Sequence, residues 1–192
     1  GTDSEGRRTH DRVRAINTHL KARGLSTWFD EDRMQGNVIE KMCEGIDDSD
    51  LIVVFVTQHY IDKVGGKYGP ADNCKKEFEY AERTKGADRF IPVVMEAAVR
   101  DTRSWRGGVG MVLGSRLYQD LSAAEGTPEW ERGLQSLHDE IVQYKGQEGL
   151  APPRLPPTSV SLPPDEAPQG KPSPLPLPPP PPNPPPPPPP PP

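Results

Sequence analysis

Cysteine is scarce in this chain, because the 192 residues include only Cys43 and Cys74. Two cysteines do not make the disulfide framework of a small secreted domain, so we expect a reducing, cytoplasmic compartment. No apolar run approaches the roughly 18 residues of a membrane span, and no signal peptide is visible. The four histidines are scattered and show no metal-ligand spacing with the cysteines. We therefore expect no membrane contact from this segment and no metal site.

Basic residues are fewer than acidic ones, with 23 Lys and Arg against 28 Asp and Glu. The formal net charge is −5 and the sequence pI is about 5.4. A protein that binds phosphate backbones usually presents a basic face. The charge balance therefore argues against nucleic acid as a partner.

Proline is almost missing from the first part of the chain and crowded into the last. Residues 149–192 hold 24 of the 27 prolines, and every aromatic residue precedes Lys145. We expect a globular domain over residues 1–148 and a disordered tail over 149–192, which cannot bury a core. The tail would form a polyproline II helix. It could bind the groove of an SH3, WW or profilin-type protein, or it could be a stiff spacer.

The spacing of apolar residues predicts alternating helices and strands. Four helices are expected, at 9–23, 38–46, 73–84 and from Pro128 to about 144. Four strands are expected, at 25–30, 50–57, 90–95 and 116–121. The β-branched run of 50–57 predicts a strand buried on both faces, whereas Pro92 suggests a near-edge position for its strand. We expect loops at 58–72 and at the Gly-rich stretch 104–113.

This alternation predicts an α/β fold with a doubly wound, three-layer parallel sheet of order 2-1-3-4-5. In that order the first strand is central, yet the chain starts with a helix. We expect the first strand to lie upstream of Gly1, so that residues 1–148 are an N-terminally truncated domain.

Several motifs in order give the chain a family resemblance. The stretch from Leu20 to Asp30 reads LKARGLSTWFD, and the strand at 50–57 and the run 72–81, DNCKKEFEYA, follow it. Phe90-Ile91-Pro92-Val93-Val94 and Trp105-x-Gly107 come later. Together, over about residues 9–144, these resemble a Toll/interleukin-1 receptor (TIR) domain. The resemblance implies a flavodoxin-like fold, self-association with other TIR domains in a homo-oligomer, and signalling in innate immunity or cell death.

The resemblance also implies an activity. Some TIR domains hydrolyse NAD⁺ to nicotinamide and ADP-ribose products through one glutamate, and Glu77 occupies the matching position. NAD⁺ would be the substrate, and no cofactor is implied. A fixed carboxylate can stabilise the oxocarbenium charge that develops on the ribose. The alternatives are that Glu77 is a solvated residue balancing neighbouring lysines, and that the domain is a catalytically silent scaffold.

Four further residues are candidates for the NAD⁺ pocket. Asp30 precedes the loop of residues 31–37 and Arg33 lies within it; in similar proteins this loop mediates TIR–TIR contacts and borders the nucleotide pocket. Asn73 stands where active relatives often carry an aromatic residue, four positions before the glutamate. Trp105 can supply a ring for stacking, or it can be a packing residue of the core.

Overall fold

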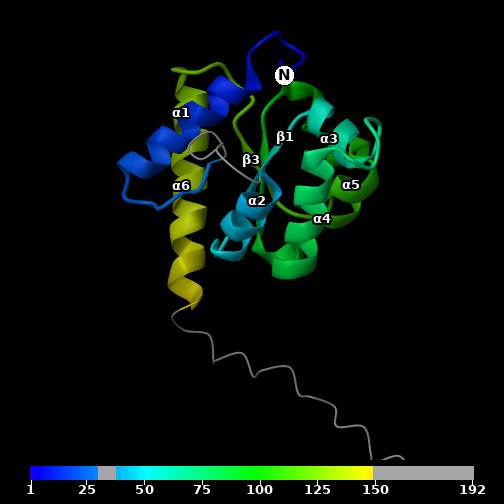
Figure 1. Ribbon diagram of the computed structural model, residues 1–192. Coiled ribbons are helices and arrows are strands. Elements are labelled where there is room, and N and C mark those ends of the chain that lie inside the picture. The colour runs from blue at the N-terminus through cyan, green and yellow to red at the C-terminus, as the bar shows by residue number, and fades with distance from the viewer. Residues whose placement is uncertain (30–37, 149–192) are drawn as a thin grey trace, which may run out of the picture. The chain divides into compact units, whose positions relative to one another are not determined.

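The computed structural model describes residues 1–29 and 38–148 and shows a parallel sheet between two layers of helices (Figure 1). The strands are β1 (Ile52–Val56), β2 (Phe90–Val94) and β3 (Gln119–Asp120), paired in the order β1-β2-β3. The α-helices are α1 (Thr9–Ala22), α2 (Val38–Asp47), α3 (Gln58–Val64), α4 (Asn73–Lys85), α5 (Gly107–Leu113) and α6 (Pro128–Glu148). Short 3₁₀ turns lie at Ala87–Arg89, Ala97–Val99 and Thr102–Ser104. The mixed α/β architecture with a parallel sheet is as predicted.

Two cores cover the two faces of the sheet. One joins α1 and α6 to the sheet through residues such as Ile16, Leu137 and Val93. The other joins α2, α3, α4 and α5 to the opposite face, and Val56 and Phe78 belong to it. Alternate residues of β1 belong to opposite cores, as expected for a strand covered by helices on both faces.

Pro92 suggested a near-edge strand, and β2 pairs on one side with β1 and on the other with β3, the last strand of the described sheet. The carbonyl of Val94 accepts a hydrogen bond from the N–H of Leu121 in the β3 chain segment. The backbone N–H and C=O groups of a strand alternate in direction, so those of Pro92, two residues before Val94, also face the β3 side. The β3 ladder begins only at Val93, opposite Gln119. The missing N–H of Pro92 therefore costs no hydrogen bond in the described sheet.

The strand expected at 25–30 is not formed over its described part, residues 25–29. Its side chains nevertheless alternate as in a strand. Thr27 hydrogen-bonds Asn17 of α1 and Phe29 stacks on His10, whereas Trp28 contacts Gly45 of α2. The segment has the shape of a strand but has no hydrogen-bonded neighbour among the described residues.

Two helices lie where loops were expected. Thr57 follows β1 and caps α3 by accepting a hydrogen bond from the N–H of Tyr60 at 3.1 Å. The Gly-rich stretch forms α5, whose Val109 and Leu113 are fully buried. Gly110 lies so close to the Trp105 carbonyl that an added Cβ would overlap it. The glycines of this stretch permit close packing rather than irregular backbone.

Candidate functional site

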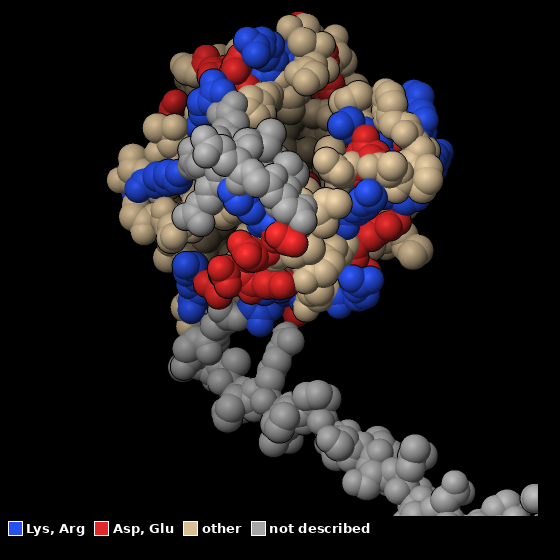
Figure 2. All heavy atoms as spheres, viewed as in Figure 1, with Lys and Arg blue, Asp and Glu red and all other residues tan. Residues whose placement is uncertain are grey.

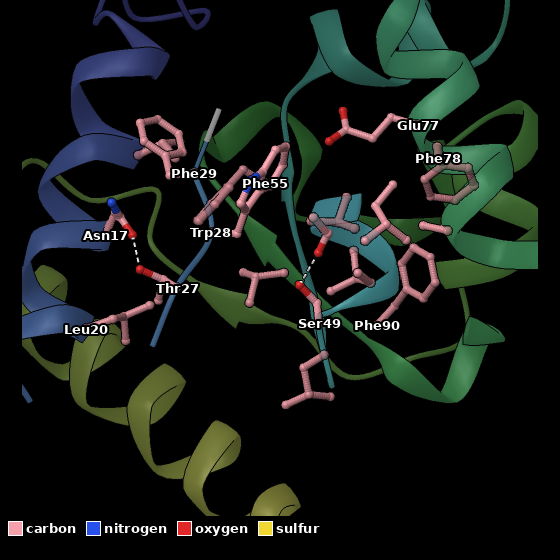
Figure 3. Close-up of a pocket in the computed structure, with 18 of the residues that line it drawn as sticks. Asn17, Leu20, Thr27, Trp28, Phe29, Ser49, Phe55, Glu77, Phe78 and Phe90 are labelled. Atoms are coloured by element: carbon pink, nitrogen blue, oxygen red, sulfur yellow. Dashed lines mark hydrogen bonds between the residues drawn. The ribbon is translucent and has the colours of Figure 1, made fainter. Parts of the chain in front are cut away.

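A cavity of about 1160 Å³ opens beside β1. Its walls come from α1, residues 25–29, α2, β1, α3 and α4 (Figure 3). One part runs along β1, and the other reaches the carboxyl end of the strand, where Thr57, Tyr60 and Glu77 line it. The carboxyl ends of parallel strands are where α/β folds usually bind ligands.

Glu77 is held at this cavity by the start of α4. The Asp72 carboxylate accepts the N–H of Cys74 at 2.9 Å and so begins the helix. One turn later Glu77 is half-buried, and Figure 3 shows its carboxylate pointing from α4 toward the cavity. The next residue, Phe78, is 3% exposed and packs in the core. A carboxylate at this position can act on a bound ligand.

Tyr60 and Lys63 bring polar groups from α3 to the same wall. They lie three residues apart, on one helical face, and both line the cavity. Burial raises the pKa of the Tyr60 phenol well above its usual value, and the nearby Glu77 and Cys74 side chains raise it further. The phenol is therefore protonated at neutral pH and can donate a hydrogen bond next to Glu77.

Cys74 is the thiol of this wall. The Lys63 amine lies 3.6 Å from the Cys74 sulfur and 3.6 Å from an Asp72 oxygen. Burial raises the pKa of the thiol, and although Lys63 opposes this change, the pKa stays above its usual value. A protonated thiol is a poor nucleophile, so the chemistry of this wall rests on Glu77 rather than on Cys74.

Of the three predicted site residues that the structure describes, one lines the cavity. That residue is Glu77, whereas Asn73 is exposed at the start of α4. Trp105 is 4% exposed and donates its ring N–H to the Val99 carbonyl at 2.8 Å. Trp105 is therefore a core residue, and it does not line the cavity. Asp30 and Arg33 lie outside the described residues.

Sequence reasoning overlooked Tyr60 and Lys63, and it assigned no site role to the cavity aromatics. The rings that line the cavity are Trp28, Phe29, Phe55, Tyr60, Phe78 and Phe90. One signal was available for Tyr60, because it follows the end of a strongly predicted strand by three residues. In parallel α/β folds that position faces the ligand-binding edge.

The ends of β2 and β3 are closed by a buried polar cluster that the sequence did not reveal. Arg12 of α1 is 2% exposed and donates to the carbonyls of Met95 and Leu121, each at 2.6 Å. Glu96, 1% exposed, accepts the N–H groups of Ser4 and Gln58 at 2.5 Å. With these ends occupied, the open cavity is confined to the β1 side.

Other kinds of site find little support in the described part of the chain. Within residues 1–29 and 38–148, no group of three or more His, Cys, Asp or Glu side chains could hold a metal ion. No helix in those ranges is long and apolar enough to cross a membrane. Acidic side chains gather over α2 on one face (Figure 2), where Glu40, Glu44, Asp47 and Asp48 are exposed.

The fold and the cavity define an α/β protein with helices on both faces of a parallel sheet and a ligand-sized opening at one strand. Comparison with protein families identifies it further, because residues 6–138 match the TIR domain. The chain therefore belongs to the TIR domain family, which implies a role in signalling through protein–protein interaction. Comparisons with curated proteins and with solved structures give no match.

Proposed function

We propose that this TIR domain signals by self-association and hydrolyses NAD⁺ to nicotinamide and ADP-ribose. The observation that carries the proposal is the half-buried Glu77 carboxylate at a large cavity, beside the protonated Tyr60. The domain would act in the cytoplasm, in innate-immune or cell-death signalling. It would need no cofactor, since NAD⁺ is the substrate.

The part of the cavity at the carboxyl end of β1 has the chemistry of a dinucleotide site. Ligand pockets commonly combine apolar walls with a few polar groups. This part offers the Tyr60 ring for a flat base and the Lys63 ammonium for phosphate. Burial lowers the pKa of Lys63, but its interactions with Cys74 and Asp72 outweigh that effect and raise it. Lys63 is therefore a cation at neutral pH.

The reaction breaks the bond between the nicotinamide nitrogen and C1′ of the ribose. The bonding electron pair leaves with nicotinamide and neutralises its positive charge, so positive charge develops on the ribose. The Glu77 carboxylate stabilises that charge and can hold a ribose hydroxyl. Water adds to C1′, and its proton passes to the carboxylate or to solvent.

A second function is a TIR scaffold without catalysis, which two placements favour. Asn73 is exposed and carries no ring where active relatives often have one, and Trp105 is buried in the core. In that case assembly with other TIR domains would be the whole function. The loop of residues 31–37, with Arg33, would carry part of the contact in either case.

Incubation of the assembled chain with NAD⁺ separates the two functions. We expect nicotinamide release that disappears in Glu77→Ala while the oligomeric state, measured by light scattering, is unchanged. A folded, oligomerised wild type that releases no nicotinamide would leave the scaffold as the function. Release that survives Glu77→Ala would place the chemistry elsewhere.

The sheet order of the whole domain is part of the proposal. In the order 2-1-3-4-5, residues 25–29 belong to the second strand, and β1, β2 and β3 are the third to fifth. The place of the first strand then lies between residues 25–29 and β1. The observation that supports this order is the cavity between those two segments.

A further inference from the structure

The joint between α1 and α6 contains a histidine nitrogen without a hydrogen-bond partner. The two helices pack on the same face of the sheet (Figure 1), where Ile16 and Leu137 belong to one core. His19, near the end of α1, is partly buried, and its Nε2 atom is shielded from solvent. Among residues 1–29 and 38–148, no group forms a hydrogen bond with that atom. Buried polar atoms of native proteins nearly always have a partner, so this ring calls for an explanation.

The charged form of His19 does not suit this place. A protonated imidazole carries an N–H on both ring nitrogens. The Nε2 atom would then be a buried, charged donor with no acceptor in the described part of the chain. Burial of such a group costs free energy, and the cost disappears once the atom reaches water. The packed joint therefore favours the neutral ring.

The charges around His19 act mainly in the same direction. They are Arg23 of α1 and, from α6, Glu131 and His138. Burial lowers the pKa of His19, Arg23 and His138 lower it further, and Glu131 offsets only part of the change. The stability that the neutral ring contributes is complete above the ordinary pKa of about 6.5. It is lost as the pH falls through the lowered pKa of the folded state.

A second imidazole lies in the same joint. The side chain of His138 is 19% exposed, and its Nδ1 atom lies 3.2 Å from an Asp139 oxygen that also accepts from the Gln135 amide at 2.7 Å. Gln135 in turn accepts a hydrogen bond from the Arg23 guanidinium. Imidazole is the side chain that changes charge near neutral pH. Acid therefore adds positive charge on both helices, where Arg23 already supplies one.

The same part of α1 forms a wall of the cavity. Asn17 and Leu20, which lie next to His19 along the helix, both line the cavity. The Thr27 hydroxyl donates a hydrogen bond of 2.5 Å to the Asn17 side chain, and Figure 3 shows Asn17 and Leu20 beside that segment. A shift of this turn of α1 away from α6 would therefore move the cavity wall as well.

We propose that His19 is a proton-operated switch in the joint between α1 and α6. While the ring is neutral, the end of α1 packs against α6. When the ring takes up a proton, the end of α1 separates from α6, and Nε2 reaches water. The cavity wall that Asn17 and Leu20 form loosens with it. The switch belongs to the packing of α1 and does not depend on NAD⁺ hydrolysis.

Amide hydrogen exchange of the full chain at about pH 7.5 and about pH 5.5 tests the switch without any turnover measurement. Protection factors, which remove the intrinsic pH dependence of exchange, are compared at Leu20, Lys21 and Ala22 of α1. The reference is Met95, which is fully buried and donates its N–H to the Val56 carbonyl at 3.0 Å. A loss confined to α1 then differs from unfolding of the whole domain.

Three variants assign the proton. His19→Phe keeps a flat ring that cannot ionise, and His19→Gln keeps a polar, uncharged group in case the phenyl ring does not fit. His59→Gln removes an exposed histidine of α3 and is the matched control. The two His19 variants should keep α1 equally protected at both pH values, whereas the control should behave as the wild type does.

We expect the wild-type protection at the three α1 amides to fall about three- to tenfold between the two pH values, with Met95 unchanged. Equal protection at both pH values in the wild type would overturn the proposal. So would a fall that persists in both His19 variants, because another group would then be the sensor. An equal fall at Met95 would also overturn it, since acid would then unfold the whole domain.

Discussion

Arg12, only 2% exposed, donates a hydrogen bond of 2.6 Å to the backbone carbonyl of Met95. The same guanidinium donates to Leu121 at 2.6 Å and to Ala123 at 2.8 Å, and lies 3.2 Å from Asp3. One side chain thus joins α1 to the carboxyl ends of β2 and β3. The Arg12 side chain therefore covers the carboxyl ends of β2 and β3, and the cavity lies beside β1.

Replacement of Arg12 should destabilise the fold strongly. Arg12→Met keeps much of the apolar stem but removes the guanidinium that donates to the Leu121 and Ala123 carbonyls and to Asp3. We expect a loss of about 3–5 kcal/mol in the free energy of unfolding, measured by urea denaturation. Arg14→Met on the same helix removes an exposed pair with Asp11 and should cost less than about 1 kcal/mol. Equal, small losses in both variants would contradict the structural role of Arg12.

Asp3 should make the stability depend on acid pH. Burial raises the pKa of its carboxyl, but hydrogen bonds from Arg7 and Glu5 and the charge of Arg7 outweigh burial and leave the pKa below its usual value. A lowered pKa in the folded state contributes stability above the unfolded value of about 3.9, and that stability is lost as the pH falls through the folded pKa. The free energy of unfolding, measured with urea between pH 6 and pH 2, should therefore fall more steeply for the wild type than for Asp3→Asn. Parallel curves would contradict the prediction.

Trp105 should act on stability and not on substrate binding. Trp105→Phe removes the ring N–H that reaches the Val99 carbonyl and should cost about 1–3 kcal/mol in urea denaturation. Tyr118→Phe, which removes an exposed hydrogen bond to the Arg100 carbonyl, should cost less. The KM for NAD⁺ should be unchanged in both variants. A raised KM in Trp105→Phe with unchanged stability would place the ring in the substrate site.

The strand and helix predictions succeeded where one local pattern dominated. The β-branched run around Val54 formed β1, and the periodic apolar residues of 9–23 formed α1. They failed where tertiary contacts decide. Pro92 fits a strand that pairs on both sides because β3 is only two residues long and begins opposite Val93, which the local sequence does not reveal. The helix α5 forms among glycines because Val109 and Leu113 are buried against the core.

The candidate site was predictable only in part. Glu77 could be found from the family resemblance, and it does line the cavity. Tyr60 and Lys63 depend on α3, a seven-residue helix for which the sequence carries no clear signal beyond the Thr57 cap. Arg12 and Glu96 are far apart in the sequence, and charge alone predicts exposure for both. Their burial follows from hydrogen bonds to backbone groups that only the folded chain brings together.

The central claim is that the Glu77 carboxylate cleaves NAD⁺ at this cavity. Its most direct test is the initial rate of nicotinamide release by Glu77→Gln beside Glu79→Gln, a matched change on the solvent-exposed face of α4. We predict that Glu77→Gln lowers kcat by about 100-fold or more while the fold and the assembly stay intact, and that Glu79→Gln stays within about twofold of the wild type. Equal rates in the wild type and in Glu77→Gln would contradict the account.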